Sequence, residues 1–247
     1  MCGRFALNAE TDEMIQEFVA AGGDFRDWRP RFSIAPTNKA PIVRELLNDE
    51  QLERRLEFAK WDFPRSPYST AKGPSINARL DKLTTTWAGP LASTRCLVPM
   101  TGYFEWVGPK TDRRPQFIHR ARAVATSPLL AAAGLYKAVE TDQGHELRFV
   151  IITDEGRDAS GEVHDRMPVF LTPDVWDEWL SPASFTPASR ASATVAEARA
   201  RKESALEAIT ASGIAVAKTL DYYPVDKKVN NVRTADPFDA SLVERVG

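Results

Sequence analysis

Apolar residues recur at helical spacing near the start of the chain. The positions in question are Met14, Ile15, Phe18 and Val19. On a helix of 3.6 residues per turn these side chains share one face, while polar residues occupy the opposite face. Gly22 and Gly23 follow, and glycine is typical of helix ends. The pattern predicts an amphipathic helix from Thr11 to about Ala21.

Two further helices are predicted in the second half of the chain. Thr172 precedes Pro173, and a capping residue followed by proline favours a first helical turn. The helix that begins there contains Trp176 and Trp179. A longer, Ala-rich and charged helix is predicted at about 192–211, from Ser192 to Ala211, and Gly213 is expected to end it.

Strand patterns dominate between these helices. Leu52, Leu56 and Phe58 alternate with charged residues, as on a strand with one face in water. Other short apolar runs are also typical of strands; they lie at 115–120, 129–136, 148–153 and 168–171. Most connections are of turn length, without regular strand–helix alternation, which favours an antiparallel sheet. We expect an α+β fold with an antiparallel, barrel-like β core and peripheral helices.

Length and composition indicate a globular protein with a sizeable core. The chain has 247 residues, 43% of them hydrophobic. No linker, low-complexity tract or repeat divides it, so we predict a single domain over residues 1–247 with its core at about 2–235. No run approaches the roughly 18 apolar residues of a membrane span. No charged-then-apolar leader precedes Cys2, and we expect a cytoplasmic protein.

Charge and cysteine content exclude several function classes. The net charge is −2, from 32 basic and 34 acidic residues, which argues against nucleic-acid binding through a global basic field. Cys2 and Cys96 are the only cysteines, too few for a disulfide scaffold. Cys96 lies in an apolar run and is predicted to be a buried small hydrophobe. No metal-ligand spacing or Gly-rich phosphate loop is present, so we expect no metal and no cofactor.

Cys2 is the first candidate for chemistry. If Met1 is removed, the N-terminal cysteine presents an α-amine and a thiol on adjacent carbons. An α-amine has a pKa of about 7.7–8.0 against about 10.4 for lysine, so much more of it is unprotonated at neutral pH. An amine can form a Schiff base with an aldehyde, and the thiol can then close a thiazolidine ring. The alternative is that Cys2 is merely a small residue behind the initiator methionine.

Three further segments contain polar residues in unusual surroundings. Asn77 and Arg79 are two residues apart, so on an extended chain both project to one side. Glu105 lies among three aromatic residues, and an apolar setting raises the pKa of a carboxyl toward the range useful for proton transfer. His164 stands beside two charged residues, just before an apolar strand. Each has a structural alternative: a turn asparagine, a surface glutamate and a histidine that serves only as a hydrogen-bond donor.

Together, these segments resemble one protein family. The chain is similar to the SRAP proteins, the abasic-site-processing family, over nearly its whole length and in the family's order. One such motif alone is weak, whereas about eight in register are specific. The matching segments are Met1-Cys2-Gly3-Arg4-Phe5, Ile34-Ala35-Pro36-Thr37, Trp61, Ile76-Asn77-Ala78-Arg79, Arg95-Cys96-Leu97-Val98-Pro99, Tyr103-Phe104-Glu105-Trp106, Ala133-Gly134-Leu135-Tyr136, Ile151-Ile152-Thr153, His164-Asp165-Arg166-Met167-Pro168 and Val229-Asn230-Asn231.

The resemblance implies the SRAP fold and a covalent reaction with abasic sites in single-stranded DNA. Met1 is lost through the protein's own processing, and Cys2 then crosslinks to the aldehyde of the ring-opened deoxyribose. By position, Asn77 holds the terminal amine and the sugar hydroxyl, and Glu105 shuttles protons during imine formation. His164 assists sugar ring opening or a strand-cleaving elimination. Autoproteolytic and lyase activities belong to the same expectation.

The resemblance also implies a DNA-binding surface. Arginine suits phosphate because its fork forms charge-assisted hydrogen bonds, and apolar platforms stack bases. The implied DNA-binding residues are Arg4, Pro36, Trp61, Arg79, Trp106, Thr153 and Arg166. The expected partner is single-stranded DNA with abasic sites, including junctions with duplex. We expect a monomer that associates with the nucleoid of a bacterial-type cell at damage.

Two positions depart from the family's pattern. The stretch Trp61-Asp62-Phe63-Pro64 is one residue shorter than usual and contains an additional carboxylate, which we expect to repel phosphate. Asp81 stands where a glutamate is common, and no catalytic role is transferred to it.

Two other readings of the sequence stay open. In one, the protein is an N-terminal-nucleophile thiol peptidase or amidohydrolase, with Cys2 attacking external amides. In the other, it is a non-catalytic reader of modified DNA in which Glu105 and His164 are structural.

Overall fold

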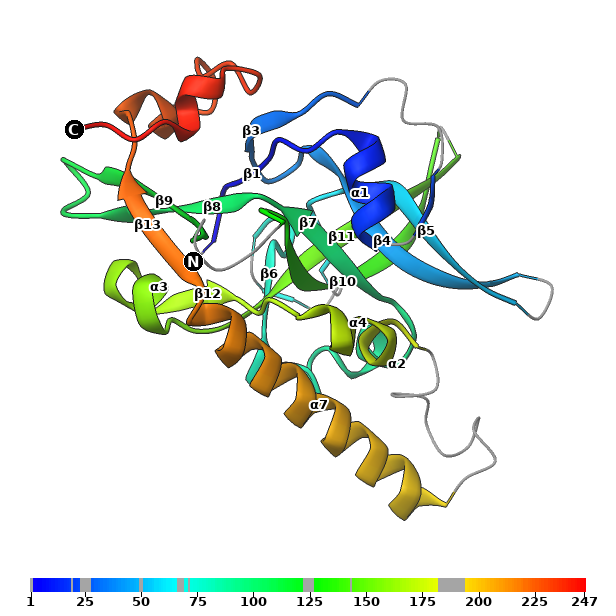
Figure 1. Cartoon of the computed structure of the whole chain (residues 1–247). Helices are drawn as coiled ribbons and strands as arrows, with labels where there is room; N and C mark the ends of the chain where they lie inside the picture. Colours follow the sequence, from blue (N-terminus) through cyan, green and yellow to red (C-terminus); the bar gives the residue numbers. More distant parts are fainter. Residues whose placement is uncertain are drawn as a thin grey trace.

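The computed structural model describes residues 2–18, 20–22, 28–48, 51–65, 69–70, 72–121, 127–142, 144–181 and 194–247. Strands form the body of the molecule and helices lie around it (Figure 1). The helices are α1 Thr11–Phe18, α2 Ala88–Ser93, α3 Asp158–Val163, α4 Pro173–Leu180 and α7 Val195–Ala217, with the short 3₁₀ turns η1 Leu80–Lys82, η2 Lys227–Asn230 and η3 Ala240–Val243.

The larger sheet contains a closed ring of strands. Its strands are β2 Ala21–Gly22, β4 Lys39–Asn48, β5 Gln51–Lys60, β6 Asn77–Arg79, β7 Arg95–Met100, β10 Leu130–Thr141, β11 Gly144–Glu155 and β12 Arg166–Pro168. The order β12-β11-β10-β7-β4-β5-β2 returns on itself because β11 also pairs with β5, through Arg148 and Lys60. β6 pairs with β11 outside this path. The ring confirms the predicted barrel-like core.

The second sheet has five strands in the order β13-β9-β8-β1-β3. They are β1 Phe5–Leu7, β3 Arg31–Ile34, β8 Gly102–Val107, β9 Arg114–Arg120 and β13 Leu220–Pro224. All of its pairs are antiparallel. In the larger sheet, by contrast, β2–β5, β5–β11 and β6–β11 are parallel. The antiparallel prediction therefore holds for most pairs, and the exceptions are the pairs of the short strands β2 and β6 and the contact between β5 and β11 that closes the ring.

The predicted helices are present with shifted ends. α1 ends at Phe18, and the predicted Val19 and Gly23 lie outside the described residues. α4 begins at Pro173 as predicted, although the Thr172 hydroxyl bonds to Ser212 and does not cap the helix.

The predicted start of α7 at Ser192 lies outside the described residues. The helix begins at Val195 behind a capping box of Thr194 and Glu197. It also continues past Gly213 to Ala217. A Cβ at Gly213 would lie 3.3 Å from Val169, so this glycine allows close packing and does not end the helix.

The main apolar core fills the ring and the space between the two sheets. It contains Cys2, Cys96 and the predicted helix residues Trp176 and Trp179. A smaller cluster lies on the other face of the five-stranded sheet, under the C-terminal segment. Its buried members are Ala6, Phe104, Phe117, Val225, Val229 and Leu242. Cys96 is fully buried, as predicted.

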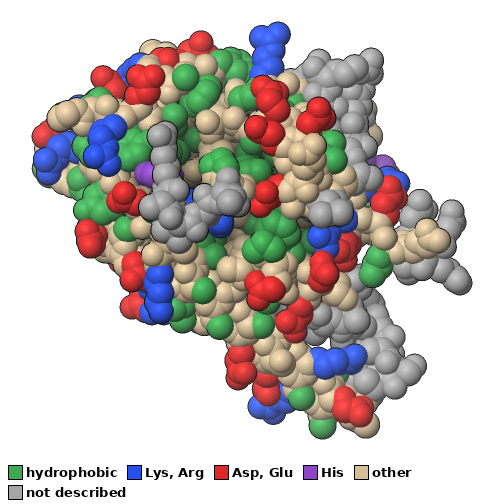
Figure 2. Space-filling view, in the orientation of Figure 1, with side chains coloured by type: hydrophobic (Ala, Val, Ile, Leu, Met, Phe, Trp, Pro, Cys, Tyr) green, Lys and Arg blue, Asp and Glu red, His purple; other side chains and the backbone are tan. Residues whose placement is uncertain are grey.

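Acidic and basic side chains are interspersed over the face shown in Figure 2. This distribution agrees with the near-balanced net charge of −2. Within the described part of the chain, no helix combines the length and the apolar character that a membrane crossing requires.

Candidate functional site

Cys2 lies in the interior, three residues before β1 begins at Phe5. Its exposed fraction is 0%, and its thiol points toward the carbonyl oxygen of Arg4 at 3.9 Å. Burial raises the pKa of the Cys2 thiol far above its usual value, and the neighbouring Glu105 carboxylate raises it further. The thiol is therefore protonated at neutral pH, and it is a weak nucleophile in this state because thiolate is the reactive form.

Asn77 holds the backbone of Cys2 from the other sheet. Its Nδ2 donates a hydrogen bond to the Cys2 carbonyl oxygen at 2.8 Å, across 75 positions of sequence. β6 is fixed in turn by Trp61, whose indole donates to the carbonyl of Ile76 at 2.8 Å. The Asn77 Oδ1 is buried and accepts no hydrogen bond from the described residues. A buried amide oxygen of this kind is available to a donor on a bound molecule.

Glu105 lies on β8 with 3% of its surface exposed. Burial raises the pKa of its carboxyl from 4.5 to about 7. The direction of this shift agrees with the prediction, but its cause is burial in the interior, since the adjacent Phe104 and Trp106 lie on the other face of β8. A carboxyl with this pKa can both give and accept a proton near neutral pH.

His164 approaches Glu105 from the turn that follows α3. Its Nε2 is 3.9 Å from the Glu105 Oε2. Its Nδ1 is 2.6 Å from the exposed carboxylate of Asp165 and 3.0 Å from the backbone nitrogen of Arg166. The Arg166 amide donates to Nδ1, which favours a neutral ring with its proton on Nε2, whereas the Asp165 carboxylate beside Nδ1 favours a proton on Nδ1. Burial lowers the pKa of His164, which favours the neutral form.

A buried hydroxyl pair, absent from the sequence predictions, connects these two groups. The Tyr103 phenol donates to the Ser160 hydroxyl at 2.8 Å. Tyr103 is two residues before Glu105 on β8, and the Ser160 carbonyl accepts a hydrogen bond from the His164 amide at 2.9 Å. The sequence signal for Tyr103 is its alternation with Glu105 on one strand; Ser160 gives none.

Thr153 lies between two of the predicted phosphate ligands. β11 pairs Thr153 with Arg79 on β6 and with Pro168 on β12. Arg166 donates to the Thr153 carbonyl at 2.6 Å and to its hydroxyl at 2.8 Å. Thr153 is fully buried, so it orders Arg166. Arg79 is exposed and forms a bidentate pair with Asp81.

Arg4 and Trp106 connect the site to the C-terminal segment. Arg4 is only 4% exposed, and one guanidinium nitrogen donates to the Ser33 hydroxyl at 3.0 Å and to the Val229 carbonyl at 2.9 Å. This placement differs from the exposed phosphate contact expected for Arg4. The half-buried Trp106 donates to the Asn230 side chain at 2.6 Å. Pro36 is also half-buried.

The Trp61-Asp62 stretch is placed differently from the expectation. Trp61 has no exposed surface and packs against Phe5 and Phe149, so bases cannot stack on it in this conformation. Asp62 is 5% exposed and accepts from Arg148 at 2.7 Å, with Lys60 at 3.2 Å. These cations compensate its charge, so the expected repulsion of phosphate does not apply.

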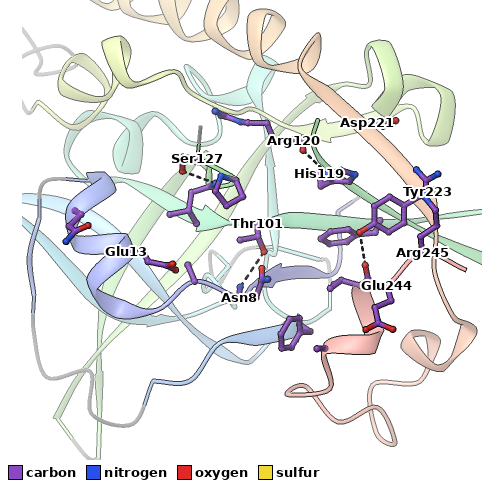
Figure 3. Close-up of a pocket in the computed structure, with 18 residues that line it drawn as sticks. Asn8, Glu13, Thr101, His119, Arg120, Ser127, Asp221, Tyr223, Glu244 and Arg245 are labelled. Carbon is purple, nitrogen blue, oxygen red and sulfur yellow. Dashed lines mark hydrogen bonds between the residues drawn. The ribbon is translucent and has the colours of Figure 1, made fainter. Parts of the chain in front are cut away.

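A separate cavity of about 1210 Å³ lies on the other face of the five-stranded sheet. His119, Thr101 and Tyr223 line it (Figure 3). Phe117 also lines it and pairs with Phe104 across the two strands. Successive residues of a strand point to opposite faces, so Glu105 points away from this cavity. The described residues contain no group of His, Cys, Asp and Glu suited to a metal ion.

Comparisons with known proteins agree on one family. A model of the family described as "SOS response associated peptidase (SRAP)" matches residues 1–232. The abasic site processing protein YoaM of Bacillus subtilis is 32% identical over 193 residues, which cover 76% of this chain and 82% of YoaM. The abasic site processing protein YedK of Escherichia coli is 29% identical over 244 residues, covering 94% of this chain and 96% of YedK.

Solved structures show the same fold. A protein from Bacteroides thetaiotaomicron superposes with a TM-score of 0.70 at 19% identity, covering 99% of this chain and 100% of that one. A phage-related protein from Bordetella bronchiseptica gives a TM-score of 0.61 at 27% identity, with coverage of 91% and 94%. Since the family model spans nearly the whole chain and the fold is shared, the chain belongs to the SOS response associated peptidase (SRAP) family.

Proposed function

We propose that the protein captures abasic sites in single-stranded DNA by a covalent bond to Cys2. The observation that supports this most is that three segments distant in sequence come together around that residue. Asn77 donates a hydrogen bond to the Cys2 carbonyl oxygen. The Glu105 carboxylate raises the pKa of the Cys2 thiol, and the His164 Nε2 is 3.9 Å from that carboxylate. The similar proteins YoaM and YedK bear the name abasic site processing protein.

The proposed reaction begins with removal of Met1 by hydrolysis of its peptide bond, which frees the α-amine of Cys2. This amine attacks the aldehyde carbon of the ring-opened sugar, and the carbinolamine loses water to give an imine. Glu105 donates the proton that leaves with the hydroxyl group. The thiol sulfur then adds to the imine carbon, and its proton passes to the nitrogen, closing a thiazolidine.

Burial of the thiol supports this order of events. A protonated, enclosed thiol attacks slowly, whereas an α-amine near its ordinary pKa of about 8 is partly unprotonated at neutral pH. The amine therefore reacts first, and the thiol adds once the imine carbon is held beside it. A thiol peptidase needs thiolate at the outset, so the same burial favours the crosslink over the peptidase alternative.

His164 is proposed to assist opening of the sugar ring. In the tautomer with its proton on Nδ1, Nε2 can accept the proton of the sugar's anomeric hydroxyl and return it to the ring oxygen as the C1′–O4′ bond breaks, which opens the hemiacetal. The same nitrogen can remove a proton next to the imine, which would cleave the strand by elimination. We propose this lyase step as secondary to capture.

Intact-mass spectrometry tests the proposed function. The mature protein is mixed with a single-stranded oligonucleotide containing one abasic site, and the expected product has the mass of protein plus oligonucleotide minus one water. An oligonucleotide whose abasic aldehyde has been reduced to an alcohol should give no adduct. A product of full mass with the reduced oligonucleotide, or none with either, contradicts the proposal.

Cys2→Ser is the matched variant because it keeps the α-amine and replaces only sulfur. We expect an imine that borohydride traps but no heat-stable adduct without borohydride. Cys2→Ala should behave in the same way. A heat-stable adduct with either variant would show that sulfur is not the bonding atom. Turnover of peptides by the wild type, without any adduct, would favour the peptidase instead.

A further inference from the structure

Arg79, an exposed arginine two residues after Asn77 on β6, does not have its full hydrogen-bonding fork available. Arg79 directs its Nε to Asp81 Oδ1 and one terminal nitrogen to Oδ2, both at 2.8 Å. The carboxylate thus covers one complete edge of the guanidinium. This bidentate geometry is the one with which arginine also binds phosphate.

Asp81 lies among positive charges. The Lys82 ammonium is 4.0 Å from the same carboxylate, and Arg166 also acts on Asp81 electrostatically. The hydrogen bond from Arg79 lowers the pKa of Asp81 most, and the positive charges of Arg79, Lys82 and Arg166 lower it further. The carboxylate therefore stays ionised, at a place where three cationic side chains meet.

This group of charges adjoins the candidate site. Arg79 follows Asn77 on β6 by two residues, and Asn77 contacts Cys2. Arg79 also lies opposite Thr153 on β11, to which Arg166 bonds. A DNA backbone with its sugar at Cys2 would place a neighbouring phosphate close to Arg79 and Asp81.

We propose that Asp81 is an intramolecular substitute for a DNA phosphate and weakens binding to intact single strands. This inference rests on the proposed function and concerns the affinity step before the covalent bond. An incoming phosphate must displace Asp81 from Arg79, or bind the remaining edge of the guanidinium beside a negative charge. Either route lowers affinity for any strand, whereas a captured abasic site is retained by its covalent bond.

The pair is weak enough to be displaced. The side chains of Arg79 and Asp81 are 58% and 50% exposed, and exposed ion pairs contribute little to stability. The repulsion between carboxylate and phosphate is screened in the same way. We therefore expect Asp81 to change affinity by about three- to tenfold, the range for single charge contacts in high dielectric.

The experiment measures non-covalent binding of a labelled single-stranded oligonucleotide without abasic sites, by fluorescence anisotropy at several salt concentrations. Asp81→Asn should tighten binding about three- to tenfold. It should also steepen the dependence of log K on log salt by about 0.7, the value for one additional phosphate contact on a single strand.

Two control experiments test whether the effect of Asp81→Asn depends on its position and on Arg79. Asp142→Asn makes the same charge change in the exposed turn between β10 and β11 and should alter affinity by less than about twofold. In an Arg79→Ala background, the gain from Asp81→Asn should be clearly smaller. Unchanged or weaker binding by Asp81→Asn, an equal effect of Asp142→Asn, or a full gain without Arg79 would overturn the proposal.

The crosslinking assay separates this inference from the proposed function. If the wild type forms an adduct with abasic DNA and Asp81→Asn does not tighten binding to intact DNA, only the role of Asp81 is wrong. If the wild type forms no adduct, the proposed function fails whatever the affinities are.

Discussion

Tyr103 and Ser160 join the two elements that present Glu105 and His164. The hydrogen bond between their hydroxyls is 2.8 Å long, and both residues are fully buried. Tyr103 shares its strand face with Glu105, whereas Ser160 begins the turn that ends at His164. The distance between the Glu105 carboxyl and the His164 ring therefore depends on the buried hydrogen bond between Tyr103 and Ser160.

Removing either hydroxyl should destabilise the fold, because the other is left buried without its partner. We expect Tyr103→Phe and Ser160→Ala each to lower the free energy of unfolding by about 1–3 kcal/mol. The double variant should lose less than the sum of the two. Urea unfolding measures both quantities. The matched control is Tyr222→Phe, whose exposed hydroxyl bonds to Glu162; an equal loss there would remove the special role of Tyr103.

Glu105 should make stability depend on pH. Burial raises the pKa of its carboxyl from 4.5 to about 7, so the folded protein binds this proton more tightly than the unfolded chain. The resulting stabilisation is complete below about pH 4.5 and is lost as the pH rises through 7. Glu105→Gln lacks this dependence.

Between pH 5 and 8 the unfolding free energy of the wild type should therefore fall by about 2 kcal/mol relative to Glu105→Gln. Denaturant unfolding across this range measures the difference. Glu207→Gln, at an exposed position of α7, is the control and should track the wild type. A constant difference between wild type and Glu105→Gln would show that the carboxyl titrates normally.

Asn77 should control the rate of crosslinking through the position of Cys2. Asn77→Ala removes the donor to the Cys2 carbonyl, and small misplacements of a reacting group can cost up to about 10²-fold. We expect a rate loss of about tenfold or more at saturating abasic DNA. Asn77→Asp should lower the rate further, because it places a carboxylate oxygen against the Cys2 carbonyl oxygen and the two repel each other.

The rate of adduct formation, followed on denaturing gels, measures this effect, and circular dichroism checks the fold. Asn8→Ala changes an exposed asparagine beside the separate cavity and should react at the wild-type rate. Equal rates for Asn77→Ala and Asn8→Ala would exclude the positioning role.

Asp62 should stabilise the closure of the strand ring. It accepts from Arg148 on β11 and lies near Lys60 on β5, the two residues that pair where the ring closes. Asp62→Asn should destabilise the protein by about 1–3 kcal/mol because it removes the buried carboxylate that bonds to Arg148 and Lys60, although Arg148 keeps its pair with Glu146. Asp81→Asn, the same substitution in an exposed pair, should change stability by less than about 0.5 kcal/mol. Urea midpoints at constant m-value compare them.

The sequence predicted those features that depend on local pattern. The Thr172-Pro173 start gives α4, and the alternation around Leu56 gives β5, because each is determined by residues close together in the chain. The direction of the pKa shift of Glu105 was also predicted, although the burial that causes it comes from packing against other segments and not from the adjacent Phe104 and Trp106. The motif resemblance correctly indicated the family. Cys2, Asn77, Glu105 and His164 also lie near one another in the structure, and their catalytic roles stay predictions.

Features that depend on contacts between distant segments were not predictable. Nothing local distinguishes Trp61, a core residue, from a tryptophan exposed for stacking. From the sequence, Asp62 is only an additional negative charge. In the structure Arg148, 86 positions away, donates to its carboxylate and compensates that charge. Similarly, the sequence predicts Arg4 as a phosphate ligand, whereas in the structure its guanidinium donates to the Val229 carbonyl oxygen. Only the three-dimensional arrangement determines which arginines remain exposed.

The enclosure of Cys2 has a consequence for its lifetime. Peroxide and electrophilic reagents react with the thiolate form of cysteine, and only where solvent can reach it. The rate of cysteine oxidation therefore depends on ionisation of the thiol and on its exposure. A protonated thiol with 0% exposure resists both kinds of reagent. Under the proposed function the sulfur must remain reduced until an abasic site arrives, so burial of the thiol keeps the protein competent for capture.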